Sequence, residues 1–302
     1  MNRTPLLASA SSKVPSSTRK KRLTPWQRFP YPVLGAWLIA EHSFCEQRVH
    51  LWLQDPGERV SVPRQLEGAP VASSLEGSAD LGRSLHNALA EPAKEILPED
   101  LSGLEASGEL YHLVETPFSG EYDGLPLLGR PDVVILQKRR ALMVIDYKST
   151  GSTQLPMGYR VQLYVYGYLL EQNGYDTQDL ILACVLIPPA NAELIANTSG
   201  KVIEAVIRKV NSSRERAPEA RNWTAKKWKL LGLPAILRAF PYDRQRAIRE
   251  LAFVSDYWRG RRGPIPSTKV EKCRCCLYNK LRLCKHAVTG YSESSGAIHT
   301  VV

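Results

Sequence analysis

The stretch ALMVIDYKSTG, which begins at Ala141, sets an acid and a base at the end of an apolar run. The five apolar residues before Asp146 predict a buried strand, and side chains two positions apart on a strand point to the same face. Asp146 and Lys148 should therefore stand side by side. Because a buried charge without a partner is costly, the two either neutralise each other or hold something between them.

A second acid, Asp132, stands in GRPDVV at the start of the preceding apolar run. The charged turn Lys138–Arg140 joins the two runs and predicts a hairpin, which can bring Asp132 near Asp146. Two close carboxylates repel unless one is protonated or both share a cation. Mg²⁺ or Mn²⁺ suits such oxygen ligands, and Lys148 would then orient a water or stabilise charge on a phosphate.

Each of these residues also has a plainer interpretation. Asp146 and Lys148 would form an ordinary ion pair at a sheet edge, and Asp132 would be a turn residue after Pro131. The ordered set carries more weight than any one member, because short patterns of this kind recur by chance.

The ordered set resembles the signature of the PD-(D/E)XK nucleases, with Pro131–Asp132 as its first half and Asp146-Tyr147-Lys148 as its second. YRVQLYVYGY places Gln162 and Tyr166 as Q-x-x-x-Y on the next predicted helix, similar to the RecB-type subgroup. GRSLHNAL places His86 on an upstream predicted helix, where that subgroup has a metal-binding histidine.

The resemblance implies a role for each matching position. His86, Asp132 and Asp146 would bind the divalent metal, with the backbone carbonyl of Tyr147 as a further ligand, and Lys148 would serve the attacking water. Gln162 and Tyr166 would steady the active site or contact the DNA backbone. By itself, a lone histidine on an amphipathic helix is more often a packing or surface residue, so His86 depends on its partners.

Four of the six cysteines are crowded into CRCCLYNKLRLC, from Cys273 to Cys284. In a reducing compartment this spacing favours soft-metal binding over a disulfide framework. Cys273-x-x-Cys276 and Cys284 offer three ligands, and Cys45 offers a fourth. Cys275 remains an alternative ligand. Cys184, inside LILACVLI, should pack as a small apolar side chain.

One N-terminal cysteine followed by a C-terminal trio resembles the iron–sulfur RecB-like nucleases, which include the CRISPR-associated Cas-four and exonuclease-five families. This resemblance implies a [4Fe–4S] cluster on Cys45, Cys273, Cys276 and Cys284 that clamps the ends of the domain together. Four thiolates would also hold Zn²⁺, which stays open as the alternative.

The net charge of +10 is concentrated in one part of the chain, where 22 Lys or Arg stand against 7 Asp or Glu between Lys201 and Gly290. Such a basic segment favours a polyanionic partner, nucleic acid first and an anionic membrane surface second, although a solvated surface has the same composition. Arg259, Arg261 and Arg262 are the best candidates for phosphate contacts. Trp228 and Trp258 are more readily explained as core residues than as stacking platforms for bases.

The pattern of apolar residues predicts one helix over Leu34–Gln54, another around His86, then three extended runs, a helix from Met157 to a stop at Gly174, and a buried strand in DLILACVLIPPA. A mainly helical C-terminal third follows, including AKKWKLLGLPAILRAF from Ala225. The expected fold is α/β: a restriction-endonuclease-like mixed sheet flanked by helices, with a helical, cysteine-rich C-terminal segment that closes on the N-terminal helix.

The expected organisation is a basic disordered tail at 1–30, one nuclease domain at 31–287 that includes the cysteine-rich segment, and a tail at 288–302. No apolar run reaches membrane-spanning length, and no secretory apolar region is present. We expect a cytoplasmic protein with no membrane partner. A mitochondrial setting is the alternative, because the composition of the basic tail overlaps that of transit peptides.

Together these features predict a metal-dependent DNA exonuclease directed at single strands, active in repair, recombination or CRISPR adaptation, with partner nuclease or integrase proteins. The alternative is a catalytically idle nuclease-like domain that binds DNA or a partner protein. A zinc-ribbon protein would account for the cysteines but leaves Asp132, Asp146 and Lys148 unexplained.

Overall fold

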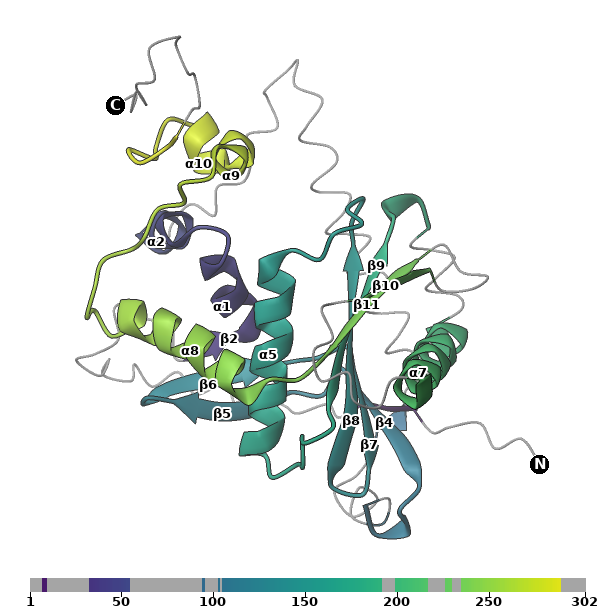
Figure 1. The fold of residues 1–302 in the computed structure, drawn as a ribbon. Coiled ribbons are helices and arrows are strands. Elements are labelled where there is room, and N and C mark those ends of the chain that lie inside the picture. Colours follow the sequence, from purple (N-terminus) through teal and green to yellow (C-terminus); the bar gives the residue numbers. More distant parts are fainter. Residues whose placement is uncertain are drawn as a thin grey trace.

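The computed structural model describes residues 7–9, 33–54, 94–95, 103, 105–191, 199–216, 226–229 and 235–288. Within these ranges a large mixed sheet and a small sheet pack with helices in an α/β arrangement (Figure 1). The large sheet has the strand order β10-β11-β9-β8-β7-β4-β1-β3, and the small sheet has the order β2-β6-β5. Each helix within the described ranges is too short or too polar to span a bilayer.

The strands of the large sheet are β1 (Leu7–Ser9), β3 (Lys94–Glu95), β4 (Leu110–Val114), β7 (Val133–Gln137), β8 (Arg140–Ser149), β9 (Ile181–Ile187), β10 (Lys226–Lys229) and β11 (Ile236–Pro241). The small sheet contains β2 (Leu34–Gly35), β5 (Phe118–Tyr122) and β6 (Leu125–Gly129). The helices are α1 (Ala36–His42), α2 (Glu46–Gln54), α5 (Met157–Gln172), α7 (Ser199–Arg216), α8 (Arg244–Trp258), α9 (Val270–Cys275) and α10 (Leu277–Lys280), with a 3₁₀ turn at Pro189–Asn191.

Two apolar layers hold the helices against the large sheet. Helix α5 lies on one face with α1 and α8 beyond it, and α7 lies on the other face (Figure 1). Strand residues alternate between the two layers: Val134, Val144 and Cys184 belong to the α5 side, whereas Val133, Ile145 and Val185 belong to the α7 side. Burial on both faces explains why these strands read as continuous apolar runs.

The predicted hairpin is confirmed as β7 and β8, joined by a tight turn at Lys138 and Arg139. Lys138 takes a positive φ of 54° in this turn. The register shifts by one residue within the hairpin: Leu136 faces Ala141, but Ile135 faces Met143, so Leu142 is the extra residue of a β-bulge. Beyond the bulge the pairing runs regularly to Val133 and Ile145.

Strand β8 pairs in parallel with β9. Two parallel neighbours need a crossover connection between them, and this connection contains α5. The predicted helix from Met157 is confirmed, and the chain leaves it through Gly174, whose φ of 78° suits glycine. The expected strand in DLILACVLIPPA is confirmed as β9.

The single helix expected over Leu34–Gln54 is wrong. The segment forms β2, α1 and α2, with a break at Ser43–Cys45. The Ser43 hydroxyl donates to the Ala40 carbonyl at 2.7 Å, and the backbone amides of Phe44 and Cys45 both reach back to the Glu41 carbonyl, which closes the first helix there. Apolar periodicity persists across the break, so the sequence pattern does not reveal it.

The helix expected from Ala225 is also wrong, because this segment supplies β10 and β11. Pro234 already counts against a helix, and the six residues of β11 pair antiparallel with β9 along their whole length. Pairing with an existing buried strand outweighs the local helical pattern. In the segment expected to be a disordered tail, Leu7–Ser9 form β1 beside β4.

Candidate active site

Two buried acids stand at the same end of neighbouring strands. Asp132 precedes β7 and is 2% exposed, and Asp146 lies in β8 and is 1% exposed. One step beyond the Val133–Ile145 pair, the register sets them opposite each other, and both line one open cleft. The Tyr147 amide donates to Oδ2 of Asp132 at 2.6 Å, which fixes that carboxylate.

Lys148 follows two residues after Asp146 on the same face, as the alternation along the strand predicts. Its Nζ lies 2.8 Å from Oδ2 of Asp146. Burial alone would lower the pKa of Lys148, but the Asp146 and Asp132 carboxylates outweigh it, and the pKa is raised above its usual value. The ammonium is therefore charged, and it is ion-paired with Asp146. The Tyr147 side chain is buried on the opposite, α7 side, so that residue offers the cleft its backbone alone.

Gln162 and Tyr166 lie one turn apart on α5 and face the same cleft. The Gln162 amide donates to the Tyr166 hydroxyl at 2.6 Å, and this hydroxyl donates to the Arg130 carbonyl at 3.2 Å. Burial raises the pKa of Tyr166 well above its usual value, so the phenol stays protonated. These two residues thus connect α5 to the segment that leads into Asp132.

Sequence reasoning missed several residues that line this cleft: Gly35, Ala36, Trp37, Glu115, Leu128 and Arg130. Arg130 was visible as the neighbour of the Pro131–Asp132 pair. Its Nε donates to the Glu115 carbonyl at 2.8 Å and lies 3.5 Å from the Glu115 carboxylate. No sequence pattern marks Gly35, Ala36 and Trp37 as residues of the cleft, because they reach it only through the pairing of β2 with β6.

The donor set of the cleft fits a hard divalent cation. Asp132 and Asp146 are hard oxygen donors that stand on adjoining strands, and both are shielded from bulk water while facing an open cleft. Mg²⁺ and Mn²⁺ are commonly held by one or two carboxylates together with water and substrate phosphate. His86, the third expected ligand, lies outside the described residues.

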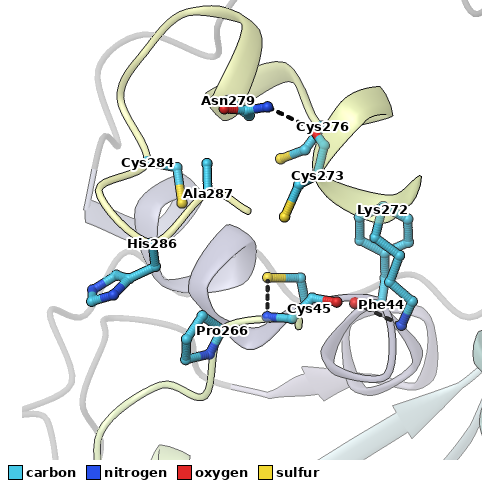
Figure 2. Close-up of a pocket in the computed structure, with 11 residues that line it drawn as sticks. Phe44, Cys45, Pro266, Lys272, Cys273, Cys276, Asn279, Cys284, His286 and Ala287 are labelled. Atoms are coloured by element: carbon cyan, nitrogen blue, oxygen red, sulfur yellow. Dashed lines mark hydrogen bonds between the residues drawn. The ribbon is translucent and has the colours of Figure 1, made fainter. Parts of the chain in front are cut away.

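A second group of residues, the thiol pocket, consists of Cys45, Cys273, Cys276 and Cys284, which line one small pocket. Their sulfur atoms point into a common space, whereas the His286 ring points away from it (Figure 2). Cys275 is exposed and does not line this pocket, and its thiol donates to the Lys272 carbonyl. Cys184 is fully buried beside Asp146 in the sheet, as expected for a packing residue.

The break between α1 and α2 places Cys45 in the thiol pocket. The Ser267 amide donates to the Cys45 sulfur at 3.3 Å, and the Lys272 ammonium donates to the carbonyls of Ser43 and Phe44 at 2.8 and 2.9 Å. These contacts join the C-terminal segment to the N-terminal helices, and α9 and α10 lie beside α2 in Figure 1. Four converging thiols fit a soft metal or an iron–sulfur cluster in kind. Among the described residues, no group of three or more His, Cys, Asp or Glu side chains is close enough to hold a single ion.

Buried polar residues next to Cys45 connect α1 and α2 to α8. Glu46 accepts from Arg262 and from the Ile265 amide, and it contacts Nδ1 of His42 at 3.0 Å. The Trp258 indole donates to Nε2 of His42 at 3.0 Å, so Trp258 is a core residue. Burial disfavours the charged form of Glu46, but these hydrogen bonds outweigh it and lower its pKa to about 2.

The three arginines expected to contact phosphate all pair with carboxylates. Arg259 binds Asp123, Arg261 bridges Asp123 and Asp256, and Arg262 binds Glu46. Arg262 therefore has a structural role between α2 and α8. None of the three lines the cleft that contains Asp146. The side chain of Trp228 lies outside the described residues.

A family model described as the PD-(D/E)XK nuclease superfamily matches residues 48–284. The crystal structure of SSO0001, an archaeal protein, is similar with 15% identity and a TM-score of 0.41, over 86% of this chain and 88% of that chain. No protein with a curated description matches the sequence at a significant level.

Proposed function

The chain belongs to the PD-(D/E)XK nuclease superfamily, and from this membership we propose that it is a divalent-metal-dependent exonuclease that hydrolyses phosphodiester bonds from an end of single-stranded DNA. The observation that carries the proposal is the placement of Asp132, Asp146 and Lys148 in one open cleft. Superfamily membership implies a nucleic-acid substrate and nuclease activity in general. The choice of DNA, of single strands and of cleavage from an end is our proposal.

In the proposed reaction, Asp132 and Asp146 hold a Mg²⁺ or Mn²⁺ ion, with the Tyr147 carbonyl and His86 as further ligands. When bound, such an ion activates water and stabilises charge on phosphate oxygens. Asp132 keeps its orientation through the Tyr147 amide, so the carboxylate need not reorganise when substrate arrives.

Lys148 is proposed to act on the attacking water. Its ammonium is charged and ion-paired with Asp146, so it donates rather than accepts a hydrogen bond. In that form the ammonium donates a hydrogen bond to a lone pair of the water oxygen, which orients the water. Its positive charge also neutralises the charge that builds up on the phosphate. Gln162 and Tyr166 keep the cleft wall in place through their contacts with each other and with the Arg130 carbonyl.

We further propose that Cys45, Cys273, Cys276 and Cys284 hold a [4Fe–4S] cluster, with Zn²⁺ as the alternative. The support is the donor set, which brings four thiols to one pocket from segments more than 220 residues apart. A metal group there would fasten the C-terminal segment to the break between α1 and α2.

The biological process that we propose for the nuclease is DNA repair, recombination or CRISPR adaptation, alongside partner nuclease or integrase proteins.

The decisive experiment is a cleavage assay on end-labelled single-stranded and duplex DNA, with Mg²⁺, with Mn²⁺ and with a chelator. We expect metal-dependent loss of the single strand and no cleavage by the Asp146→Asn variant. DNA binding without cleavage in all metals would support instead the alternative of an idle nuclease-like domain that binds DNA or a partner protein. A matched control is Glu250→Gln, because Glu250 pairs with Arg246 on α8 and does not line the cleft.

A further inference from the structure

Trp37 is an exposed aromatic residue in the lining of the cleft. It lies in the first turn of α1, lines the same cleft as Asp146 and Lys148, and leaves 52% of its surface exposed. Tryptophan is a large side chain that folding usually buries. An aromatic ring exposed beside a candidate active site is therefore a candidate for ligand contact.

The ring of Trp37 is held in position by two neighbours. A Cβ atom added to Gly35 would lie 2.7 Å from Nε1 and 2.9 Å from Cδ1 of Trp37, so the indole rests against a glycine that has no room for a side chain. The ring of Trp52 meets Trp37 edge-on, with 5.6 Å between ring centroids and an interplanar angle of 72°. A ring fixed in this way loses little freedom when a ligand binds.

The residues that line the cleft near Trp37 include an exposed apolar side chain and several charged groups. Leu128, which is 37% exposed, pairs with Gly35 across β2 and β6 and lines the cleft as well. Arg130 and Lys148 line the same cleft, where Arg130 pairs with Glu115 and Lys148 pairs with Asp146. An exposed aromatic face beside paired cationic and acidic side chains matches a nucleotide whose base stacks while its phosphate reaches the charged groups.

From these contacts we infer that Trp37 is a stacking platform for an unpaired DNA base and makes the cleft selective for single strands. A base within a duplex has both faces covered by its neighbours and cannot offer one to the indole without unstacking. A single strand can rotate a base onto the ring at little expense. This inference rests on the proposed function, since it names the substrate form that the cleft accepts.

The test measures binding separately from cleavage. Full-length protein is mixed, in the presence of a chelator, with fluorescent oligonucleotides: a single strand, a blunt duplex and a single strand that carries abasic sites. The variants are Trp37→Ala, Trp37→Phe and Gly35→Ala, and the control is Phe253→Ala, which removes an aromatic ring that is 42% exposed on α8 and does not line the cleft.

Loss of one stacked base should weaken single-strand binding by Trp37→Ala about 5- to 100-fold, with little change for the duplex. Trp37→Phe should recover most of the affinity. Gly35→Ala should lose affinity although the indole is still present, because the added methyl group displaces the ring. Abasic sites should weaken binding by the wild type but leave binding by Trp37→Ala almost unchanged.

Single-strand affinity of Trp37→Ala within twofold of the wild-type value would overturn the inference. So would an equal loss on single strand and duplex, which would indicate that the ring supports the fold or contacts a partner protein instead. If the wild type fails to cleave DNA both in the presence of Mg²⁺ and in the presence of Mn²⁺, the proposed function fails. The binding series then still decides whether Trp37 stacks on bases.

Discussion

Nζ of Lys148 and Oδ2 of Asp146 lie 2.8 Å apart, with 17% of the lysine side chain and 1% of the aspartate side chain exposed. This ion pair joins two charges in the fold, and the proposed function also gives both residues a part in cleavage, so the two roles can be tested separately. Removing one partner leaves the other charge buried and uncompensated, whereas removing both does not.

We predict that Lys148→Met lowers the cleavage rate at least about 100-fold and lowers the free energy of unfolding by about 3 kcal/mol. The double variant Asp146→Asn/Lys148→Met should be equally inactive but lose less stability than the sum of the single variants. Urea unfolding and a cleavage assay provide the two readouts. Strictly additive losses of stability would show that the pair does not interact.

The Asp132→Asn variant tests whether this carboxylate binds metal. Its Oδ2 accepts from the Tyr147 amide, and an asparagine oxygen can keep that bond, so the fold should survive. We expect Mn²⁺ binding, followed by calorimetry or paramagnetic resonance, to weaken at least about tenfold, because one negative ligand is lost. Unchanged Mn²⁺ affinity would remove Asp132 from the ligand set.

Cysteine variants distinguish the thiol pocket from its exposed neighbour. Cys45→Ala should abolish the brown colour and iron content of anaerobically purified protein and lower its thermal midpoint. Cys275→Ala should retain both, because Cys275 is exposed and does not line the pocket. A colourless wild-type preparation with one zinc ion per chain would establish the zinc alternative, and one with no metal would leave the pocket unassigned.

His112 on β4 gives a pH-dependent prediction away from the cleft. The residue is 2% exposed, neither ring nitrogen has a hydrogen-bond partner among the described residues, and burial lowers its pKa below the usual 6.5. As the pH falls below 6.5, the unfolded chain takes up a proton that the folded chain refuses, so stability is lost on acidification. Glu204 and Arg208 of α7 are the charged groups that line its pocket.

His112→Leu should therefore stabilise the protein by about 1 kcal/mol at pH 7.5, because a buried polar group without a partner is replaced by an apolar one. The gain should be larger at pH 5.5, where the wild type carries the additional proton-linked penalty. Urea midpoints at the two pH values measure this difference. An equal gain at both values would contradict the lowered pKa of His112.

Much of the candidate site followed from periodicity along the chain. Two apolar runs joined by Lys138–Arg140 predicted the hairpin, and a spacing of two placed Asp146 and Lys148 on one face. The four-residue spacing of Gln162 and Tyr166 placed them on one face of a helix, where their side chains do meet. These relationships are local, so the sequence contains enough information to predict them.

The features that escaped prediction depend on contacts between distant segments. Nothing near Trp37 reveals that β2 will pair with β6 and carry the indole to the cleft. The helical spacing around Trp228 predicted a helix, but the segment forms strands instead. Strand β11 pairs with the buried strand β9, and β10 pairs with β11. The arginines after Trp258 looked available for phosphate, since their partners Asp123 and Glu46 lie more than 130 residues earlier.

The bulge at Leu142 decides on which face of the sheet Asp146 and Lys148 lie. Without it, the pairing of Leu136 with Ala141 would run on unbroken, Ile145 would stand opposite Asp132, and Asp146 and Lys148 would turn toward α7. The β8 arm, which carries Asp146, has one residue more than the β7 arm between the turn and the acids. The bulge leaves this additional residue, Leu142, without a partner in β7. A shortened chain lacking Leu142 should still place Asp132 opposite Asp146, whereas one more residue in the β8 arm, without a second bulge, would turn the two acids to opposite faces of the sheet.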